Sequence, residues 1–310
     1  MQRLSNMKIL TLSFLSLLFF SCKKSGNSAS TQLLRTEYTS YTGDILHNEY
    51  GYDMMGRITS ITQYLNTAPP AVAVTIQYSG NEVTLISHPE NEPTMNQTKE
   101  VTLTLDADGK LLKRIGYTHG VSIVTTPEPS EYFSYDTLVC EYDAAGLLKK
   151  KTYSGYDSNW VNPTYTYSTR LNSTASFTTA DGNLVSSDEY VTYPRTTRNN
   201  GVVTVAGGSS EYHKVFDYSK SFPNRMGFKN AAVLNEFRYD YEPLLNSNYK
   251  NMHNQMVTNN TDKDINGTVV FTITTTVDAE RSYNGDGLLA ADHITPGHTQ
   301  YVEINYFYGK

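Results

Sequence analysis

The chain has 310 residues, with 31 acidic and 25 basic side chains and a formal net charge of −6 at pH 7. A net-acidic chain without a basic stripe is a poor binder of nucleic acid, so we expect no nucleic-acid partner. With only Cys22 and Cys140, the chain holds no disulfide framework, and Cys140, in a strand-like run, is expected to be a small buried residue.

Residues 1–21 have the pattern of a secretory signal. Arg3 and Lys8 precede an uncharged run that extends from Ile9 to Phe20. This run is shorter than the roughly 20 residues of a membrane-spanning helix and matches a signal-peptide core. Ser21 directly before Cys22 resembles the cleavage box of bacterial lipoproteins, although Phe19 stands where that box usually has an aliphatic residue. The resemblance implies an acylated Cys22 after cleavage; the alternative is an ordinary signal peptide with a chance cysteine.

Residues 22–32 are predicted to be the lipidated cysteine and a flexible tether, since they are small and polar with no apolar run. Lys23 is not an acidic residue of the kind that retains lipoproteins in the inner membrane. The resemblance therefore implies a lipid anchor in the outer membrane, with the periplasmic or surface face left open. Removal of residues 1–21 takes away two basic residues and no acidic one, so the mature chain is more acidic.

A short phrase recurs along residues 33–310, in which an Asp or Asn is followed three residues later by Gly. Its copies are Tyr52–Ile58, Asp106–Leu112 and Tyr142–Leu148, with looser versions at Thr179–Gly182, Asp264–Gly267 and Asn284–Leu289. Asp caps the backbone N–H groups of a type I turn and Gly supplies the positive φ that closes a three-residue hairpin loop. Each phrase therefore predicts a hairpin tip. Their unequal spacing favours a meander over a solenoid.

Between the turns, the sequence alternates with a period of two. Val101–Leu105 alternates apolar and polar residues, as does the run from Val269 to Val277. β-Branched residues at this period are typical of half-buried strands. Further tips are predicted at Gly80 and at Asn200-Gly201. We predict one mainly β domain over residues 33–310: an antiparallel meander of hairpins forming a strongly curved sheet or barrel-like fold.

The alternation is lost from about residue 212 to residue 257, where Ser221–Arg225 reads as a loop. We predict an irregular insertion here, with one or two short helices. A sheet that is apolar on one face needs cover, so we expect the insertion to plug or cap the open face. An ordinary long insertion is the alternative.

The phrases Tyr-Asp-x-x-Gly-Arg-Ile at Tyr52 and Tyr-Asp-x-x-Gly-Leu-Leu at Tyr142 resemble tyrosine–aspartate repeats of the Rhs type. With the lipoprotein-like start and the insertion at Phe222-Pro223-Asn224, the chain resembles an uncharacterised lipoprotein domain family of the Bacteroidota. The resemblance covers about residues 33–310 and implies a porin-like β fold, with no catalytic residues to transfer. The sequence lacks regular runs of about ten alternating residues with aromatic girdles. We therefore expect a water-soluble curved sheet or barrel on a lipid tether.

Asp262, Asp264 and Asn266, followed by Gly267, match the first half of an EF-hand-type calcium loop. The twelfth position of such a loop should be Glu, but here it is Ile273. The flanks read as strand, so a polar hairpin turn is the alternative. We predict no cofactor, with calcium at these three residues as the one candidate ligand.

No catalytic motif of the recognised kinds is present. We predict a non-enzymatic, membrane-tethered lipoprotein of the cell envelope, acting as a binding or assembly module. Its expected partners are the membrane, through the N-terminal lipid, and a glycan, a lipid or an envelope protein. The alternative is a glycan hydrolase that uses two carboxylates on separate strands.

Overall fold

The computed structural model describes residues 32–40, 42–70, 72–89, 95–122, 130–162, 165–218, 222–223, 233, 251–286, 288–294 and 301–309. The predicted signal, Cys22 and the tether up to residue 31 lie outside the described residues. Leu33–Phe307 forms one compact unit. A second unit joins Met1–Gln32 with Tyr308–Lys310, and only Gln32, Tyr308 and Gly309 of it are described.

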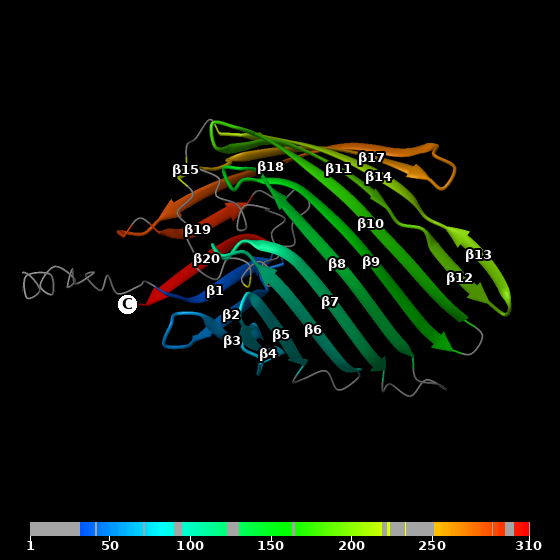
Figure 1. Ribbon diagram of the computed structural model, residues 1–310, viewed down its shortest axis with the longest axis horizontal. Helices are drawn as coiled ribbons and strands as arrows, with labels where there is room; N and C mark the ends of the chain where they lie inside the picture. Colours follow the sequence, from blue (N-terminus) through cyan, green and yellow to red (C-terminus); the bar gives the residue numbers. More distant parts are fainter. Residues whose placement is uncertain are drawn as a thin grey trace, which may run out of the picture. The chain divides into compact units, whose positions relative to one another are not determined.

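The described chain consists almost entirely of antiparallel strands (Figure 1). The strands are β1 (Gln32–Ser40), β2 (Ile45–Tyr52), β3 (Ile58–Leu65), β4 (Val72–Ser79), β5 (Glu82–Pro89), β6 (Met95–Leu105), β7 (Leu111–Ser122), β8 (Glu131–Tyr142), β9 (Leu148–Asn162), β10 (Tyr165–Ala180), β11 (Asn183–Thr192), β12 (Arg195–Asn199), β13 (Val202–Ala206), β14 (Gly208–Asp217), β15 (Phe222–Pro223), β16 (Asn251–Met252), β17 (Gln255–Asp264), β18 (Val269–Tyr283), β19 (Leu289–Ile294) and β20 (Tyr301–Gly309).

Sixteen of these strands pair in a closed ring. From β1 to β10, each strand pairs with the one that follows it in the chain. β11 then pairs with β14, and β14 pairs with β17. The ring continues through β18, β19 and β20, and β20 pairs with β1. β12 and β13 form a hairpin that extends from β10, and β15 pairs with β16 in a small separate sheet. The predicted meander is therefore confirmed, and closure makes it a barrel, which leaves no free edge.

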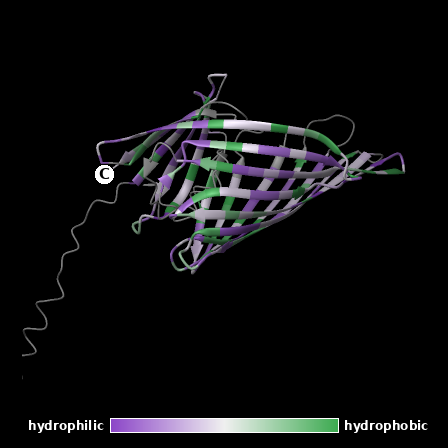
Figure 2. Cartoon of the chain, turned by 90° about the horizontal axis from the view of Figure 1, so that it is seen from above, coloured by the Kyte–Doolittle hydropathy of each residue, from purple (hydrophilic) through white to green (hydrophobic). Residues whose placement is uncertain are grey.

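Inward and outward residues alternate along each strand. On β10, Thr174 and Ser176 are exposed, whereas Ala175 between them is buried. On β18, Asp278 and Glu280 are exposed on either side of buried Ala279. Figure 2 shows the resulting change between hydrophobic and hydrophilic residues along the strands. This is the period of two that the sequence shows.

The phrase turns have one geometry. A side-chain oxygen of Asp53, Asp106, Asp143, Asp264 or Asn284 accepts hydrogen bonds from the N–H groups two and four residues later, at 2.8 to 3.0 Å. Where the Gly is described it has a positive φ: Gly56 (75°), Gly109 (83°), Gly146 (76°) and Gly267 (84°). The predicted capped three-residue loop is confirmed at these positions. Gly287, in the last phrase, lies outside the described residues.

The looser copy at Thr179–Gly182 is different. Ala180 pairs with Asn183, so the loop has only two residues, Asp181 and Gly182, with φ of 52° and 80°. The prediction of a three-residue loop here is wrong. Its Asp directly precedes the Gly, and an adjacent Asp-Gly pair favours the two-residue loop with two positive φ angles.

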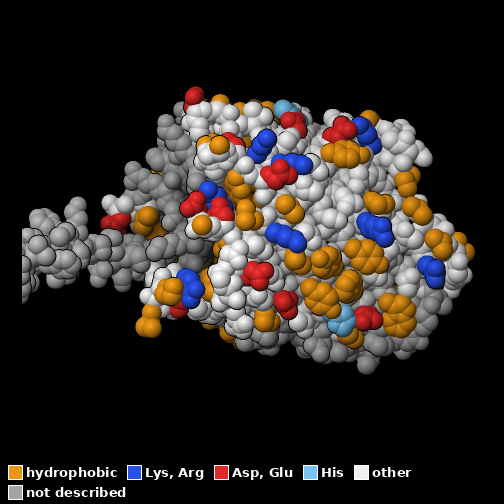
Figure 3. Space-filling view, in the orientation of Figure 1, with side chains coloured by type: hydrophobic (Ala, Val, Ile, Leu, Met, Phe, Trp, Pro, Cys, Tyr) orange, Lys and Arg blue, Asp and Glu red, His pale blue; other side chains and the backbone are white. Residues whose placement is uncertain are grey.

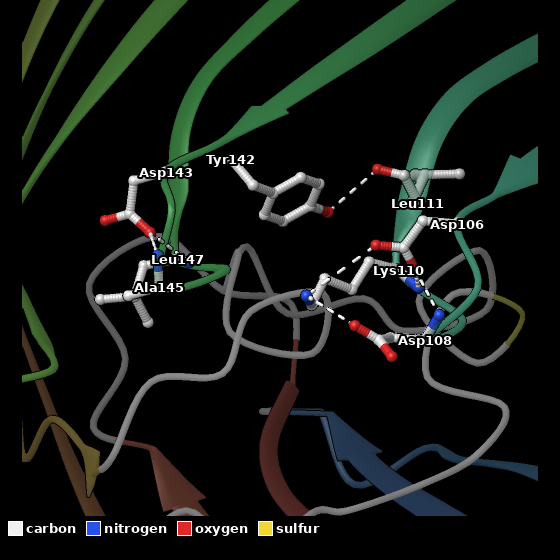
Figure 4. A network of polar contacts seen from close by, with 8 residues as sticks. All are labelled: Asp106, Asp108, Lys110, Leu111, Tyr142, Asp143, Ala145 and Leu147. Atoms are coloured by element: carbon white, nitrogen blue, oxygen red, sulfur yellow. Dashed lines mark hydrogen bonds and ion pairs between the residues drawn. The ribbon is translucent and has the colours of Figure 1, made fainter.

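Tyrosines join neighbouring hairpins near these turns (Figure 4). The Tyr142 hydroxyl donates a hydrogen bond to the carbonyl oxygen of Leu111 at 2.9 Å, and the Lys110 ammonium lies 5.8 Å from the centroid of the Tyr142 ring. The other tyrosine–carbonyl pairs of this kind are Tyr78–Ile58, Tyr52–Leu33 and Tyr218–Leu184. In Tyr52 and Tyr142, the aromatic residue before Asp in the phrase thus links one hairpin to the next.

The barrel end that carries the turns after β2, β4, β6, β8, β10 and β18 is called the tip end below. Its inner side holds an apolar core. The core residues nearest these turns are at most 1% exposed and comprise Ile58, Val83, Leu103, Leu111, Leu148, Leu184 and Leu289. Burying a side chain of this size stabilises a fold by roughly 1.5–3 kcal/mol relative to exposure, so these residues contribute strongly to packing energy.

The predicted irregular stretch at 212–257 is too wide. Residues 212–217 belong to β14 and 255–257 to β17, and the two strands pair along their lengths. Polar residues such as Lys214 point inward here, which hides the period of two. Of the remainder, the described residues include Val233, Met252 and His253, which are buried. The expected plug stays a prediction, since most of its residues lie outside the described ones. Val233 is helical, and the rest of any helix around it lies outside the described residues. Within the described residues, no helix is long and apolar enough to cross a membrane.

Candidate functional site

The outer wall of the barrel carries charged side chains on most of its strands. Strand register and exposure place the following residues outward: Glu37, Glu49, Glu100, Lys113, Glu141, Lys150, Arg170, Asp188, Glu211 and Asp278. Some pair with neighbours, as Lys150 does with Glu141 at 3.4 Å. A strand that faces lipid must instead present an apolar band. The charged side chains interrupt any continuous apolar band on these strands.

Three tyrosines stand side by side on this wall. Tyr117 of β7 is paired with Tyr135 of β8, which is paired with Tyr156 of β9. We call these three residues the tyrosine row. Glu100 of β6 and Arg170 of β10 continue the line at its two ends. Tyr117 and Tyr135 are 41% and 44% exposed, so their rings are open to solvent.

A groove of about 320 Å³ lies at the β9 end of the tyrosine row. It is lined by Tyr135, Thr137, Ser154, Gly155, Tyr156, Arg170 and Asn172. The Ser154 hydroxyl donates a hydrogen bond to Oδ1 of Asn172 at 2.9 Å, which joins β9 to β10 across its floor. The volume is at the lower end of the range for small-molecule sites. Aromatic rings, hydroxyls, an amide and a guanidinium therefore meet in one open groove.

More aromatic surface adjoins the groove. The ring of Phe133 lies 5.4 Å from that of Tyr117 and 6.4 Å from that of Tyr156, and Trp160 is 37% exposed on β9. Figure 3 shows hydrophobic side chains gathered over this part of the wall, with few charged groups among them. Aromatic side chains from three neighbouring strands therefore form one exposed surface around the groove.

The inner side of the same strands is polar. Asp136 of β8 lies between Gly116 of β7 and Gly155 of β9, and its carboxylate forms an ion pair with Arg114. A Cβ at Gly116 would clash with the Asp136 carboxylate, and one at Gly155 would clash with the Tyr153 ring. The two glycines thus leave the space that lets these polar side chains lie along the wall.

A second carboxylate lies close to this cluster. Asp157 is two residues beyond Gly155 on the same face of β9, so Asp136 and Asp157 are diagonal neighbours, with Cα atoms about 7–8 Å apart in such a pair. The Tyr132 hydroxyl is 3.4 Å from Oδ1 of Asp157. Burial raises the pKa of Tyr153 to about 12, and the nearby Asp136 carboxylate adds to this.

Two lysines also face inward. Lys151 of β9 is paired with Cys140 of β8, and its ammonium lies 5.9 Å from the centroid of the Phe177 ring. Burial lowers the pKa of Lys151 and of Lys214, and raises that of the Cys140 thiol. Cys140 is buried, as predicted. The inner wall thus combines charged groups of both signs in a partly dehydrated setting.

The predicted calcium residues lie at the turn between β17 and β18. Asp264 uses Oδ1 to cap that turn, and Asn266 is exposed in it. Asp262 is on the same face of β17 as Asp264, with a buried Oδ1 that has no hydrogen-bond partner. In the described part of the chain, no three or more His, Cys, Asp or Glu side chains are grouped to hold a metal. Calcium at Asp262, Asp264 and Asn266 stays a prediction, which calorimetric titration with calcium tests.

The tyrosine row and the paired carboxylates have no signal in the sequence. Tyr117, Tyr135 and Tyr156 are about twenty residues apart, and only the register of three strands aligns them. The one clue is composition, since the chain has 25 tyrosines against 11 phenylalanines.

Among solved structures, the chain is similar to porin-like proteins from Bacteroides, including the following two. The protein from Bacteroides vulgatus ATCC 8482 is 13% identical, with a TM-score of 0.48, over 90% of this chain and 99% of that chain. The protein from Bacteroides uniformis ATCC 8492 is 11% identical, with a TM-score of 0.43, over 89% of this chain and 98% of that chain. No family model matches the chain. No curated protein matches it either.

Proposed function

We propose that this chain is a non-enzymatic binding module of the cell envelope, tethered to the outer membrane by an acylated Cys22, with its barrel in water. The observation that carries this proposal is the charged outer wall, since a residue such as Arg170, well inside β10, would be costly against lipid. Such a barrel needs another means of membrane attachment. The signal-like residues 1–21 and the cysteine that follows supply one.

The binding role is supported by the groove beside the tyrosine row. Tyr135 and Trp160 are exposed on the outer wall and do not belong to the buried core. Large exposed rings with hydroxyl and guanidinium groups between them suit recognition of an external partner.

Membrane fractionation tests the tether. In a Gram-negative host, the wild-type chain is expected to remain with membranes after a carbonate wash and to require detergent, whereas the Cys22→Ala variant is expected to be released in soluble form. Cys140→Ala, which leaves the proposed anchor intact, is the matched control and should fractionate as the wild type does. Mass spectrometry of the wild-type N-terminus should find an acylated Cys22. A Cys22→Ala chain that stays in carbonate-washed membranes would show that the barrel itself is inserted.

The glycan hydrolase is the second candidate, and one observation favours it: Asp136 and Asp157 lie as diagonal neighbours on the inner wall. Glycosidases use carboxylate pairs about 5–5.5 Å or 6.5–9.5 Å apart, according to mechanism. Asp136 also forms an ion pair with Arg114, whereas Asp157 accepts from the Tyr132 hydroxyl. Release of reducing ends from a polysaccharide panel, lost in both Asp136→Asn and Asp157→Asn, would establish this activity. Absence of product with the wild type supports the non-enzymatic function.

A further inference from the structure

We propose that the tyrosine row and its groove bind a neutral oligosaccharide chain, laid across β7, β8, β9 and β10. This names the ligand class of the binding module proposed above and rests on that function. The tyrosine row and Arg170 together form a line perpendicular to the strands, which starts at Tyr117 and ends at Arg170. Three strand spacings of about 4.8 Å separate its ends, so its shape suits an extended ligand of several units.

The rings supply one half of sugar recognition. A pyranose ring has a face of C–H groups with slight positive charge, and the face of an aromatic ring carries the opposite charge. Tyr117 and Tyr135 expose about two-fifths of their surface, and Tyr156 forms part of the groove lining. Phe133, packed against two of these rings, supports the row without extending the groove lining.

The polar lining supplies the other half. Sugar hydroxyls donate and accept hydrogen bonds, so their site needs both kinds of group. Arg170 contributes guanidinium donors, Asn172 contributes amide donors and a carbonyl acceptor, and Thr137 and Ser154 contribute hydroxyls. Among the described residues, no ion pair occupies the guanidinium of Arg170. Each ring of the groove therefore has a hydrogen-bonding group next to it.

The same lining disfavours other ligands. A lipid chain needs a continuous apolar surface, and hydroxyl, amide and guanidinium groups interrupt this one. A stable protein interface covers about 800 Å² of each partner around an apolar centre. Here the tyrosine row has only three residues, and the charged residues Glu100 and Arg170 bound it at its two ends. One charge of each sign, on a chain of net charge −6, favours a neutral ligand over an anionic one.

Calorimetry with the full-length protein in detergent tests the proposal. The probes are linear hexasaccharides of glucose, xylose, mannose and N-acetylglucosamine. At least one is expected to bind. Its affinity should fall at least tenfold in Tyr135→Ala and in Tyr156→Ala, and should stay within a few-fold in Tyr135→Phe, which keeps the ring.

Tyr190→Ala is the matched control, because Tyr190 is an exposed tyrosine of the outer wall that does not line the groove. It should bind within twofold of the wild type, and all variants should unfold at midpoints close to that of the wild type. Failure of every hexasaccharide to bind a folded protein, or equal binding by the row variants, would overturn the inference. Binding to phospholipid vesicles that Tyr135→Ala abolishes would overturn it in favour of a lipid ligand. The lipid tether is tested separately by membrane fractionation of Cys22→Ala. The proposed tether and the proposed oligosaccharide site can therefore be rejected independently of each other.

Discussion

The tip end and the outer wall of β7–β10 use the same residue type in opposite ways. At the tip end, the Tyr142 hydroxyl donates a hydrogen bond to the backbone of the neighbouring hairpin. On the wall, Tyr135 of the same strand stands 44% exposed beside a groove. The two are an odd number of residues apart on β8, so they face opposite sides of the sheet. Tyr142 therefore links two neighbouring hairpins, whereas Tyr135 is exposed and accessible to a partner.

The largest difference between the two regions is expected in packing. Leu111→Ala, at a fully buried position, should lower the free energy of unfolding by about 2–5 kcal/mol because it leaves a cavity in the core. Leu112→Ala, one residue later and 37% exposed, should cost far less, about 0.5 kcal/mol. Urea denaturation of both variants gives the comparison. Equal losses would mean that the core is not concentrated on the inner side of the tip end.

The turn caps come next in size. Asp143→Ala removes the carboxylate that accepts from the N–H groups of Ala145 and Leu147, and should cost about 1.5–3 kcal/mol. Asp143→Asn keeps an acceptor oxygen and should be close to neutral, since Asn284 caps its own turn in the same way. The same denaturation assay measures both. An Asn variant as unstable as the Ala variant would indicate that charge, and not the acceptor, stabilises the turn.

Removing single hydroxyls sharpens the contrast between the tyrosines. Tyr142→Phe should lower the free energy of unfolding by about 1 kcal/mol, because the Leu111 carbonyl loses its donor. Tyr135→Phe should change it by less than about 0.5 kcal/mol, since Tyr135 lies exposed on the outer wall. If the two changes are equally costly, the distinction between structural and ligand-facing tyrosines fails.

The smallest effect is a pH dependence at the tip end. Burial raises the pKa of Tyr78 to about 12, so the folded state favours its neutral form. That stabilisation is complete below the ordinary tyrosine pKa of about 10 and is lost as pH rises toward 12. Tyr78→Phe should therefore lose less stability than the wild type between pH 10 and pH 11.5, measured by urea midpoints. Parallel curves over this range would show that Tyr78 does not contribute, and the range from pH 7 to pH 9 serves as the baseline.

The errors of sequence interpretation have local physical causes. The stretch at 212–257 reads as irregular because Tyr212 and Lys214, which are polar, point inward and break the expected apolar face of β14. The loop at Asp181-Gly182 resembles the other phrases, yet it lacks the two residues between Asp and Gly and so closes more tightly. In the first case a strand is present although its inward residues are polar. In the second case a hairpin turn is present although its loop is shorter than in the other phrases.

By itself, the sequence determined the strands, most of the turns and the polar character of the sheet. These depend on short-range effects, namely a period of two and the capping of a turn by Asp143 or its equivalents. Closure of the barrel through β1 and β20, the alignment of the tyrosine row, and the approach of Asp136 to Asp157 were decided only by the tertiary structure. Each depends on the register between strands, and register is set by the packing of the whole inner face.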